Sequence, residues 1–480
     1  MSIKKLGFLI KSIAILVVEY IKFLITRNQM SMVQNIAQQL AKENIFYVKI
    51  FQSLSSNNEF FTDESTEFLT QYTDRAPYTS SEINTSFIKT IDSIKKTHPE
   101  HAIVLTNLQP IQSGMVSIVY EAMMKNDKKV IIKVLRKGIR EKLKEAMEYM
   151  EYSIRFFATV PFFKHLNLLD IFMENKATMM EQLDFNHEVE NIKDMYEKNK
   201  YIDYVVVPKV YEEYTELNND MIVMDYIDGI KLSDVMDKDK DVYSYLLAKF
   251  GIKCVLFDRL YHGDLHQGNI LFMKEKCDKN NNINNNNNKD GLDDITHETN
   301  HDTYNHKLGI IDYGIIGRLT KEEQNNYYLF FKNFFHENYK DAALHIVNYL
   351  AEPKEKVEAL EKDPEKRDAL VKEIEIISEK ACKEEKRFSI HEICGINEAL
   401  SKYELKLSKS FCKIELSLAI SDSVSKHLSY ETTYMDNFEK AILEMFPKEE
   451  DDDDDTDSDD DSSNDNSESD IEIEIDYSKN

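Results

Sequence analysis

Residues 261–271 read Tyr261-His262-Gly263-Asp264-Leu265-His266-Gln267-Gly268-Asn269-Ile270-Leu271. The polar residues lie between an apolar helical segment and a short apolar strand, which predicts a loop with buried ends. Asp264 and Asn269 are five residues apart on this loop, and Mg²⁺ prefers their hard oxygen donors. His262 and His266 are an alternative metal pair. Because they accompany oxygen donors, we instead interpret His262 as a brace for the loop.

A second stretch, Ile310-Ile311-Asp312-Tyr313-Gly314, is a buried strand that ends in Asp-aromatic-Gly. The strand delivers the Asp312 carboxylate, and Gly314 permits the sharp turn that follows. Protein-kinase catalytic loops have the same Asp-x₄-Asn spacing, with the Asp near the acceptor hydroxyl and the Asn on a metal, and an Asp-aromatic-Gly comes next. The two stretches together predict a magnesium–nucleotide site.

Two charged residues further upstream complete the set that phosphoryl transfer requires. Lys133 ends the aliphatic strand at residues 130–132, so its ammonium must leave the core to meet a counter-ion. Glu188 lies in a helical segment and can supply that counter-ion. Each residue alone also fits an ordinary alternative, which is a surface lysine at a strand end or a solvated helical glutamate.

The turn that should cover a nucleotide is the least typical part. It reads Ile111-Gln112-Ser113-Gly114-Met115-Val116-Ser117-Ile118-Val119-Tyr120 and precedes the strand that leads to Lys133. Gly114 matches one kinase glycine position, whereas Gln112 and Ser117 occupy the other two. Alone it would be a plain β-turn. The order of turn, Lys, Glu, Asp-x₄-Asn and Asp-aromatic-Gly is nevertheless the order of a kinase lobe pair.

The distribution of helical and strand-like segments predicts an α+β, two-lobed, protein-kinase-like fold. We place an N-terminal helical extension at residues 1–100, a small β-rich N-lobe at 101–230 and a helical C-lobe at 231–446. A segment at 273–307, which contains an Asn run, has no apolar period and predicts a flexible insertion. Residues 447–480 are predicted to be a disordered acidic tail.

The N-terminus predicts an amphipathic helix over residues 3–26. Lys11, Glu19 and Lys22 interrupt its apolar run, so it contains no clean transmembrane span of about 20 residues. Two interpretations remain open. The helix packs on the protein's own core, or it lies on a membrane surface.

Charge and cysteine content restrict the partners and the compartment. The net charge is −27, of which residues 449–480 contribute −16. This acidity argues against a nucleic-acid partner, since phosphate contacts need Lys/Arg surfaces. The five cysteines form no C-x-x-C pair, which predicts reduced thiols in an intracellular, reducing compartment. Membrane association is compatible with this compartment, and the organelle is not indicated. The oligomeric state is not indicated.

At these motifs the chain resembles the UbiB-like (aarF-domain) atypical protein-kinase-like family. The resemblance runs from about residue 44 to about residue 446, and its most specific piece is the His-x-Asp-x-His-x-Gly-Asn loop at residues 262–269, with Gln267 where proline is usual. It implies ATP and Mg²⁺ as cofactors, an ATPase or small-molecule kinase activity, and a link to lipids at membranes. It also implies a helical extension that covers the active site.

The resemblance assigns roles to individual residues. Lys133, Glu188 and Asp264 are the implied catalytic residues, and Asn269 and Asp312 hold the metal. The implied nucleotide contacts are Gln112, Ser113, Gly114, Val119, Ile131, Lys133, Met224, Asp225, Ile227 and Asn269.

Three motifs depart from the family. The Lys-x-Gly-Gln motif of the extension is Lys49-Ile50-Phe51-Gln52, its Glu-x-Asp partner is Gln182-Leu183-Asp184, and the alanine-rich loop is the Gly114 turn. A Lys49–Asp184 pair is retained, so we expect the extension to dock.

These departures leave three functions to separate. The first is an active ATP-dependent enzyme, and the second is a pseudokinase-like scaffold that binds nucleotide or lipid without turnover. The third, an ordinary Ser/Thr protein kinase, is disfavoured because no Ala-Pro-Glu anchor follows residues 312–314.

Overall fold

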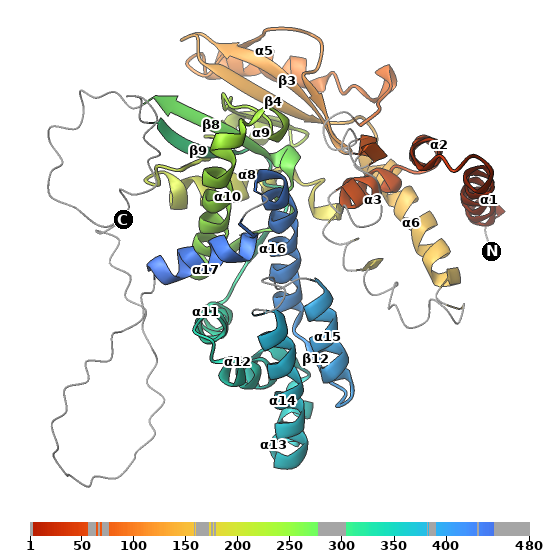
Figure 1. Cartoon of the computed structure of the whole chain (residues 1–480). Helices are drawn as coiled ribbons and strands as arrows, with labels where there is room; N and C mark the ends of the chain where they lie inside the picture. The colour runs from red at the N-terminus through yellow and green to blue at the C-terminus, as the bar shows by residue number, and fades with distance from the viewer. Residues whose placement is uncertain are drawn as a thin grey trace, which may run out of the picture.

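The computed structural model has two lobes and an N-terminal helical extension beside them (Figure 1). It describes residues 3–55, 64–65, 68–69, 76–157, 159, 172–173, 176, 179–276, 304–381, 383, 390–429 and 432–445. The predicted tail at 447–480 and most of the predicted insertion lie outside these residues.

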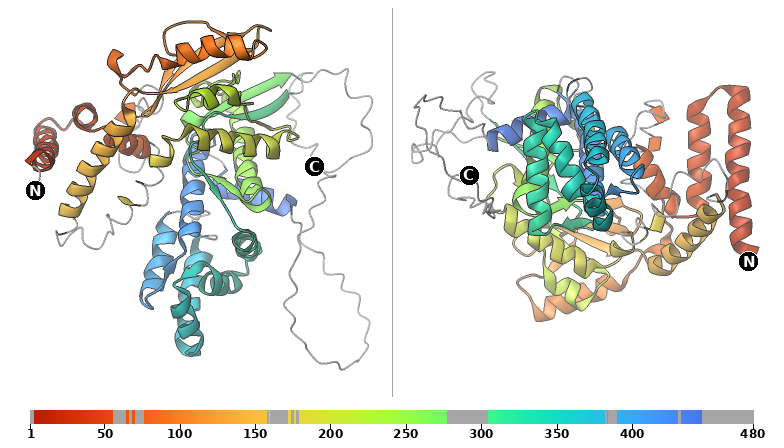
Figure 2. Two further views of the ribbon diagram at one scale, coloured as in Figure 1. Left: turned by 180° about the vertical axis from the view of Figure 1, so that it is seen from behind. Right: turned by 90° about the horizontal axis from the view of Figure 1, so that it is seen from below.

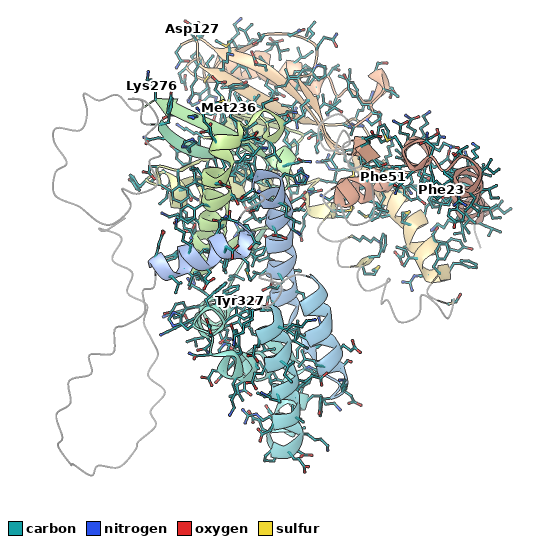
Figure 3. The ribbon with its side chains drawn as sticks, viewed as in Figure 1. Phe23, Phe51, Asp127, Met236, Lys276 and Tyr327 are labelled. Carbon is teal, nitrogen blue, oxygen red and sulfur yellow. The ribbon has the colours of Figure 1, made fainter. Side chains whose placement is uncertain are left out.

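The N-lobe is a twisted antiparallel sheet in the order β1-β3-β4-β6, with β2 paired to β3. The bounds are β1 (Ile103–Leu105), β2 (Gln112–Ser113), β3 (Ser117–Met124), β4 (Lys129–Leu135) and β6 (Met221–Asp225). Asp127 takes the left-handed conformation (φ 60°) at the tip of the β3–β4 hairpin, where a tight turn needs it (Figure 3).

One face of this sheet is covered by α5 (Ser86–Thr97). Phe87, Ile91 and Ile94 recur at helical spacing and pack on Tyr120 and Ile132 of the sheet. The Phe87 and Tyr120 rings stack with centroids 5.0 Å apart. Although α5 lies within the predicted extension at 1–100, its core is therefore that of the N-lobe sheet.

The opposite face of the sheet carries the site residues because side chains alternate along a strand. Lys133 lies opposite Val119, and Ile131 lies opposite Met224. Ile131 and Lys133 are two positions apart on the strand, so these four side chains share one face. Further helices of this lobe are α6 (Ile139–Phe157), α8 (Phe185–Asn199) and α9 (Glu212–Leu217).

Two small sheets hold the loops of the site at the top of the C-lobe. Strands β7 (Leu260–His262) and β10 (Ile316–Arg318) pair antiparallel, and β5 (Val205–Val206), β9 (Tyr304–Ile310) and β8 (Ile270–Lys276) form the second sheet. Strand β8 begins directly after Asn269, and β9 ends two residues before Asp312. Because Ile270 pairs with Ile310, Asn269 and Asp312 lie at the same end of the hairpin.

The β8–β9 hairpin corrects the predicted insertion at 273–307. Residues 273–276 pair with 304–307 in continuous antiparallel register, so the loop is shorter at both ends (Figure 3). Asp239, on α10 (Asp237–Ile252), holds this part of the ladder by accepting hydrogen bonds from Lys274 (2.7 Å) and sharing one with His306 (3.0 Å). The sequence did not predict these strand ends because they have no apolar period. Cross-strand pairing and ionic contacts stabilise them instead.

The remaining C-lobe is helical, as predicted. Its elements are α10 (Asp237–Ile252), a π-helical turn (Lys253–Phe257), α11 (Lys321–Phe335), α12 (Tyr339–His345), a second π-helical turn (Ile346–Leu350), α13 (Lys354–Glu361), α14 (Pro364–Lys380), α15 (Ile390–Ser401), α16 (Lys409–Leu428) and α17 (Tyr434–Met445), with short 3₁₀ turns at Ser80–Glu82, Leu232–Asp234 and Gln267–Asn269 and a two-residue ladder of β11 (Ala351–Glu352) and β12 (Lys406–Leu407).

The extension consists of α1 (Ile3–Thr26), α2 (Gln29–Glu43) and α3 (Phe46–Ser55). Helices α1 and α2 lie side by side as an outer hairpin, and α3 lies nearer the lobes (Figures 2 and 3). The hairpin rests on α6 through Phe8 and Tyr149, whose ring centroids are 5.5 Å apart. None of the described helices combines the length and apolarity that a membrane crossing requires.

Candidate active site

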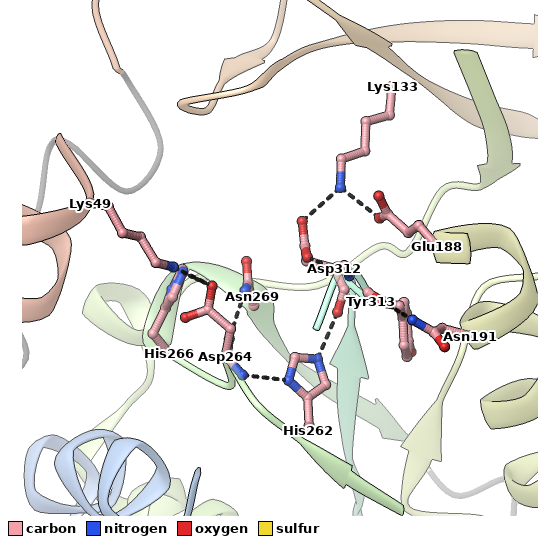
Figure 4. Close-up of polar contacts among 11 residues, drawn as sticks. Lys49, Lys133, Glu188, Asn191, His262, Asp264, His266, Asn269, Asp312 and Tyr313 are labelled. Carbon is pink, nitrogen blue, oxygen red and sulfur yellow. Dashed lines mark hydrogen bonds and ion pairs between the residues drawn. The ribbon is translucent and has the colours of Figure 1, made fainter. Parts of the chain in front are cut away.

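A buried lysine of the N-lobe contacts two carboxylates, one of which belongs to the C-lobe (Figure 4). Lys133 Nζ, from β4, lies 2.6 Å from Glu188 Oε1 on α8 and 2.7 Å from Asp312 Oδ2 after β9. Only 8% of the Lys133 side chain and 3% of the Glu188 side chain are exposed. The sequence-predicted Lys133–Glu188 pair therefore forms, and it includes Asp312 as a second acceptor.

Burial and charge together fix the protonation of this cluster. Burial disfavours the charged form of Lys133, but the two carboxylates outweigh it and raise the lysine pKa. Burial also opposes ionisation of Asp312, yet Lys133 and the Gly314 amide lower the Asp312 pKa to about 2. The pKa of Glu188 is raised, since burial outweighs its attraction to Lys133. Lys133 and Asp312 are therefore both charged at neutral pH.

His262 braces the loop of Asp264, as predicted. Its Nε2 lies 2.7 Å from the Asp312 carbonyl oxygen, and its Nδ1 accepts a hydrogen bond of 3.2 Å from the Asp264 amide. These partners assign the neutral tautomer with the proton on Nε2. Burial agrees with this, because it lowers the His262 pKa. One ring therefore links Asp264 to Asp312.

Asp264 and Asn269 are held in a fixed relation by the loop itself. Asn269 Nδ2 donates to the Asp264 carbonyl oxygen at 2.8 Å, and the Ile311 amide donates to the Asn269 carbonyl oxygen at 3.1 Å. Because the amide nitrogen is used, the Asn269 side-chain oxygen is the atom left for a metal. Figure 4 places Asn269 between Asp264 and Asp312.

The extension reaches the site through α3, but with a different partner from the predicted one. Lys49 Nζ lies 2.6 Å from Asp264 Oδ2. Asp184 instead accepts a hydrogen bond of 3.1 Å from the Asn186 amide and caps α8. A carboxylate two residues before a helical amide serves as a local cap, so Asp184 is engaged by its own helix. The Gln52 side chain lies outside the described residues.

Lys49 also changes the electrostatics of Asp264. Burial disfavours the charged carboxylate, but Lys49 and His266 outweigh it and lower the Asp264 pKa. Asp264 is therefore ionised at neutral pH and is engaged by the extension.

The predicted nucleotide residues fall into two groups. Gln112 and Ser113 form β2, with Gln112 paired to Val119, and Gly114 begins the turn to β3, where its amide donates to the Ser117 carbonyl oxygen at 2.9 Å. Ile131 and Met224 lie side by side on the face of the sheet that carries Lys133.

At the predicted hinge, the side chain of Asp225 points to other partners. It accepts from Tyr211 Oη (2.9 Å) and pairs with Lys128 Nζ (2.7 Å), so its carboxylate is occupied. Among the residues that the structure describes, no hydrogen bond uses the Ile227 amide or carbonyl. Backbone groups of Ile227 rather than the Asp225 side chain are therefore suited to an adenine edge.

The structure adds two residues that sequence reasoning did not assign. Asn191 Nδ2, one turn after Glu188, donates to the Tyr313 carbonyl oxygen at 2.9 Å, and its Oδ1 accepts from Arg318. Arg136, buried at the end of β4, contacts the Gly114 turn. The i,i+3 spacing of Glu188 and Asn191 was a usable signal, whereas nothing local distinguished Arg136.

The donors fit magnesium better than a transition metal. Within the described ranges, no three His, Cys, Asp or Glu side chains gather in a cage. Mg²⁺ is usually bound by one or two carboxylate or amide ligands together with substrate phosphates. The Asn269 and Asp312 oxygens supply such an incomplete set.

Comparison with known proteins identifies the family. The model of the ABC1 atypical kinase-like domain matches residues 73–346, which is more than half of the chain. The chain belongs to the ABC1 atypical kinase-like family. The match confirms the resemblance to UbiB-like proteins and the kinase-like fold.

Named relatives agree with this assignment. The chain is 28% identical over 263 residues to a probable protein kinase UbiB of Cronobacter sakazakii, covering 53% of this chain and 43% of that protein. It is 21% identical over 424 residues to a probable serine/threonine-protein kinase abkC of Dictyostelium discoideum, covering 80% and 60%. The chain thus spans about half the length of the curated relatives it matches.

Two solved structures are similar at low identity. The Rv3197–erythromycin complex from Mycobacterium tuberculosis has 15% identity and a TM-score of 0.42, covering 76% of this chain and 87% of that chain. The Rio2 kinase from Chaetomium thermophilum has 15% identity and a TM-score of 0.26, covering 56% and 71%. With scores this low, the assignment rests on the family match and the element order.

Proposed function

We propose that this member of the ABC1 atypical kinase-like family is a Mg²⁺- and ATP-dependent phosphotransferase or ATPase. The observation that carries the proposal is the cluster in which Lys133 contacts both Glu188 and Asp312, at 2.6 and 2.7 Å. Phosphoryl transfer depends mainly on positioned charges, and a lysine held between two lobes by carboxylates is the kinase solution.

Each residue has a definite task in this proposal. Lys133 would hold the phosphates, and Asn269 and Asp312 would hold the metal. Bound ATP would supply the phosphoryl group, and Mg²⁺ would neutralise its charge. Asp264 would orient the acceptor hydroxyl or water, and its lowered pKa keeps it ionised for that purpose. The free backbone groups of Ile227 would bind adenine.

A nucleotide-binding scaffold without turnover is the second candidate, and one observation favours it. Lys49 forms an ion pair with Asp264, the residue that must meet the acceptor. If that contact is permanent, nucleotide binds but no acceptor reaches the carboxylate.

ADP release by the purified chain separates the two candidates. We expect Mg²⁺-dependent ADP release that is lost in Asp312→Asn and retained in Asp241→Asn, an exposed carboxylate on α10. A thermal shift with ATP but equal ADP release in wild type and Asp312→Asn would support the scaffold. Absence of both signals in the wild-type protein would contradict both candidates.

We also propose that α1 places the enzyme on an anionic lipid surface. Its outward side exposes large apolar residues, including Val17 and Ile21 at 50% and 51%. Its sole acid, Glu19, points inward and is held by Lys22 (2.6 Å) and Asn35 (3.0 Å). An apolar face without exposed acids suits the boundary of an anionic bilayer.

Co-sedimentation with vesicles tests this placement. We expect binding to phosphatidylserine-containing vesicles, loss of binding in Val17→Glu/Ile21→Glu, and normal binding in Ile376→Glu. Ile376 is a matched control because it is 54% exposed on α14, away from α1. Equal binding of all three proteins would contradict the proposal, and adding the same vesicles to the ADP assay shows whether lipid changes turnover.

A further inference from the structure

We propose that Arg136 is a positioning residue that sets the shape of the phosphate-binding turn, residues 112–117. The inference rests on the proposed nucleotide site. It adds the residue that allows this atypical turn to bind phosphate. Arg136 lies three residues after Lys133, directly after β4, and is 3% exposed.

The Arg136 guanidinium donates hydrogen bonds to four acceptors on two chain segments. Nη2 donates to the Gly114 carbonyl oxygen (2.6 Å), to Ser113 Oγ (2.8 Å) and to the Ala76 carbonyl oxygen (3.0 Å). Nη1 donates to the Pro77 carbonyl oxygen at 2.8 Å. The turn is therefore fixed to residues 76–77, the segment that enters the N-lobe after the extension.

Further hydrogen bonds close the same network. The Arg136 amide donates to the Val116 carbonyl oxygen at 2.9 Å, so the residue holds the turn by its backbone as well as its side chain. The Ala76 amide donates to the Ser113 carbonyl oxygen (2.8 Å), and Ser113 Oγ donates to the Ala76 carbonyl oxygen (2.7 Å). Both ends of the turn are thus anchored.

This network determines which way the peptide groups of the turn face. A trans peptide places its N–H opposite its carbonyl, so fixing the Gly114 carbonyl on Arg136 turns the Met115 amide away from Arg136. No hydrogen bond between described residues uses the Met115 or Val116 amide. Two successive unpaired amides in a turn form a concave donor site for phosphate oxygens. Arg136 therefore presents these donors without touching the nucleotide.

Only arginine can make this set of contacts. Its planar group offers five N–H donors in a rigid fork, whereas lysine offers one ammonium. Carbonyl oxygens surround the buried charge, and the nearest acid, Glu82, lies 3.9 Å from Nη1. Since the partners are mostly backbone carbonyls, the contact acts on the conformation of the turn.

The test compares affinities for two ligands by calorimetry. Arg136→Ala should weaken a magnesium-bound, non-hydrolysable ATP analogue by roughly tenfold, the equivalent of one or two lost hydrogen bonds to phosphate. Affinity for adenosine, which has no phosphates, should stay within about twofold, since a turn effect leaves the hinge intact. Lys137→Ala is the matched control, because this exposed neighbour keeps its amide bond to the Glu82 carbonyl oxygen.

Amide hydrogen exchange measures the order of the turn directly and needs no ligand. Exchange at residues 112–117 should be faster in Arg136→Ala than in Lys137→Ala, with Arg136→Lys in between. Ser113→Ala, which removes one acceptor and should fold normally, is expected to give a smaller effect of the same kind. Equal loss of both ligands, or unchanged exchange in the turn, would overturn the proposal. If the wild-type protein binds neither ligand, the proposed function fails, while the exchange experiment still decides the role of Arg136.

Discussion

Lys133 and Lys49 each place an ammonium 2.6–2.7 Å from a carboxylate of the site, but they belong to different parts of the molecule. Lys133 comes from the N-lobe sheet, is 8% exposed and contacts two acids. Lys49 comes from the extension, is 20% exposed and contacts Asp264. Lys133 is the more buried of the two lysines, so its ion pairs cost more to break than the partly buried pair of Lys49 and Asp264. We therefore propose that the Lys133 contacts belong to the catalytic frame and that the Lys49 contact is a removable cover over Asp264.

The largest effect is expected from Lys133→Met. It removes the charge on the phosphates and leaves Glu188 and Asp312 without their cation, so ADP release should fall roughly 100- to 1,000-fold. Lys129→Met is the control, because Lys129 lies on the same strand but is exposed. A loss of less than tenfold under saturating ATP would show that Lys133 does not belong to the frame.

A buried acid that is not paired with a lysine in the described part of the chain extends the comparison of Lys133 and Lys49. Glu415 on α16 is 4% exposed, its Oε1 has no partner among the described residues, and burial raises its pKa to about 8. Because the folded form holds the proton more tightly than the unfolded chain, stability should decline as pH rises from about 4.5 to about 8.

Glu415→Gln should therefore raise the melting temperature at pH 8.5 and change it little at pH 5. The free energy of unfolding at pH 8.5 should increase by on the order of several kilocalories per mole. Glu358→Gln, an exposed acid on α13, serves as the control. Equal stabilisation at both pH values would mean that the Glu415 charge is not the cause.

Lys49→Met should have a smaller effect of opposite sign to Lys133→Met. Freeing Asp264 gives the acceptor access, so turnover should rise by about two- to fivefold while ATP affinity stays constant. Lys42→Met, on the exposed side of α2, is the control. A fall in turnover would show that Lys49 takes part in the reaction and is not a cover.

The smallest expected effect is a displacement of the pH profile. Lys49 helps to lower the Asp264 pKa, so Lys49→Met should raise it. On the acidic side of the pH profile, kcat/KM falls as Asp264 becomes protonated. This acidic limb should then move to higher pH. An unchanged limb would indicate that another group controls it.

The predictions that used local patterns were confirmed. The loop of Asp264 and Asn269 forms as their fixed spacing indicated, and Glu188 is the counter-ion of Lys133 as expected. The loop depends on a few consecutive residues, whereas the ion pair joins residues 55 apart, and Lys133 lies within β4 and not at the strand end that the sequence indicated. Family membership, taken from the same motifs, was also confirmed.

Other features could not be predicted because distant segments determine them. Lys49 meets Asp264 and not Asp184, since helix capping uses Asp184 within α8. The β8–β9 ladder extends into a polar stretch because cross-strand pairing, not apolar period, stabilises it.

By itself, the sequence determined which chemical groups this chain possesses: the ammonium, the carboxylates and the carboxamide of a magnesium–nucleotide site, in the order of two kinase-like lobes. Only the tertiary structure decided how they are used. It brought Lys133 to two acids, placed Lys49 on Asp264 and surrounded Arg136 with carbonyl oxygens of the turn and of residues 76–77. The physical reason is that spacing along the chain fixes local geometry, whereas ion pairs and buried hydrogen bonds form wherever folding brings their partners together.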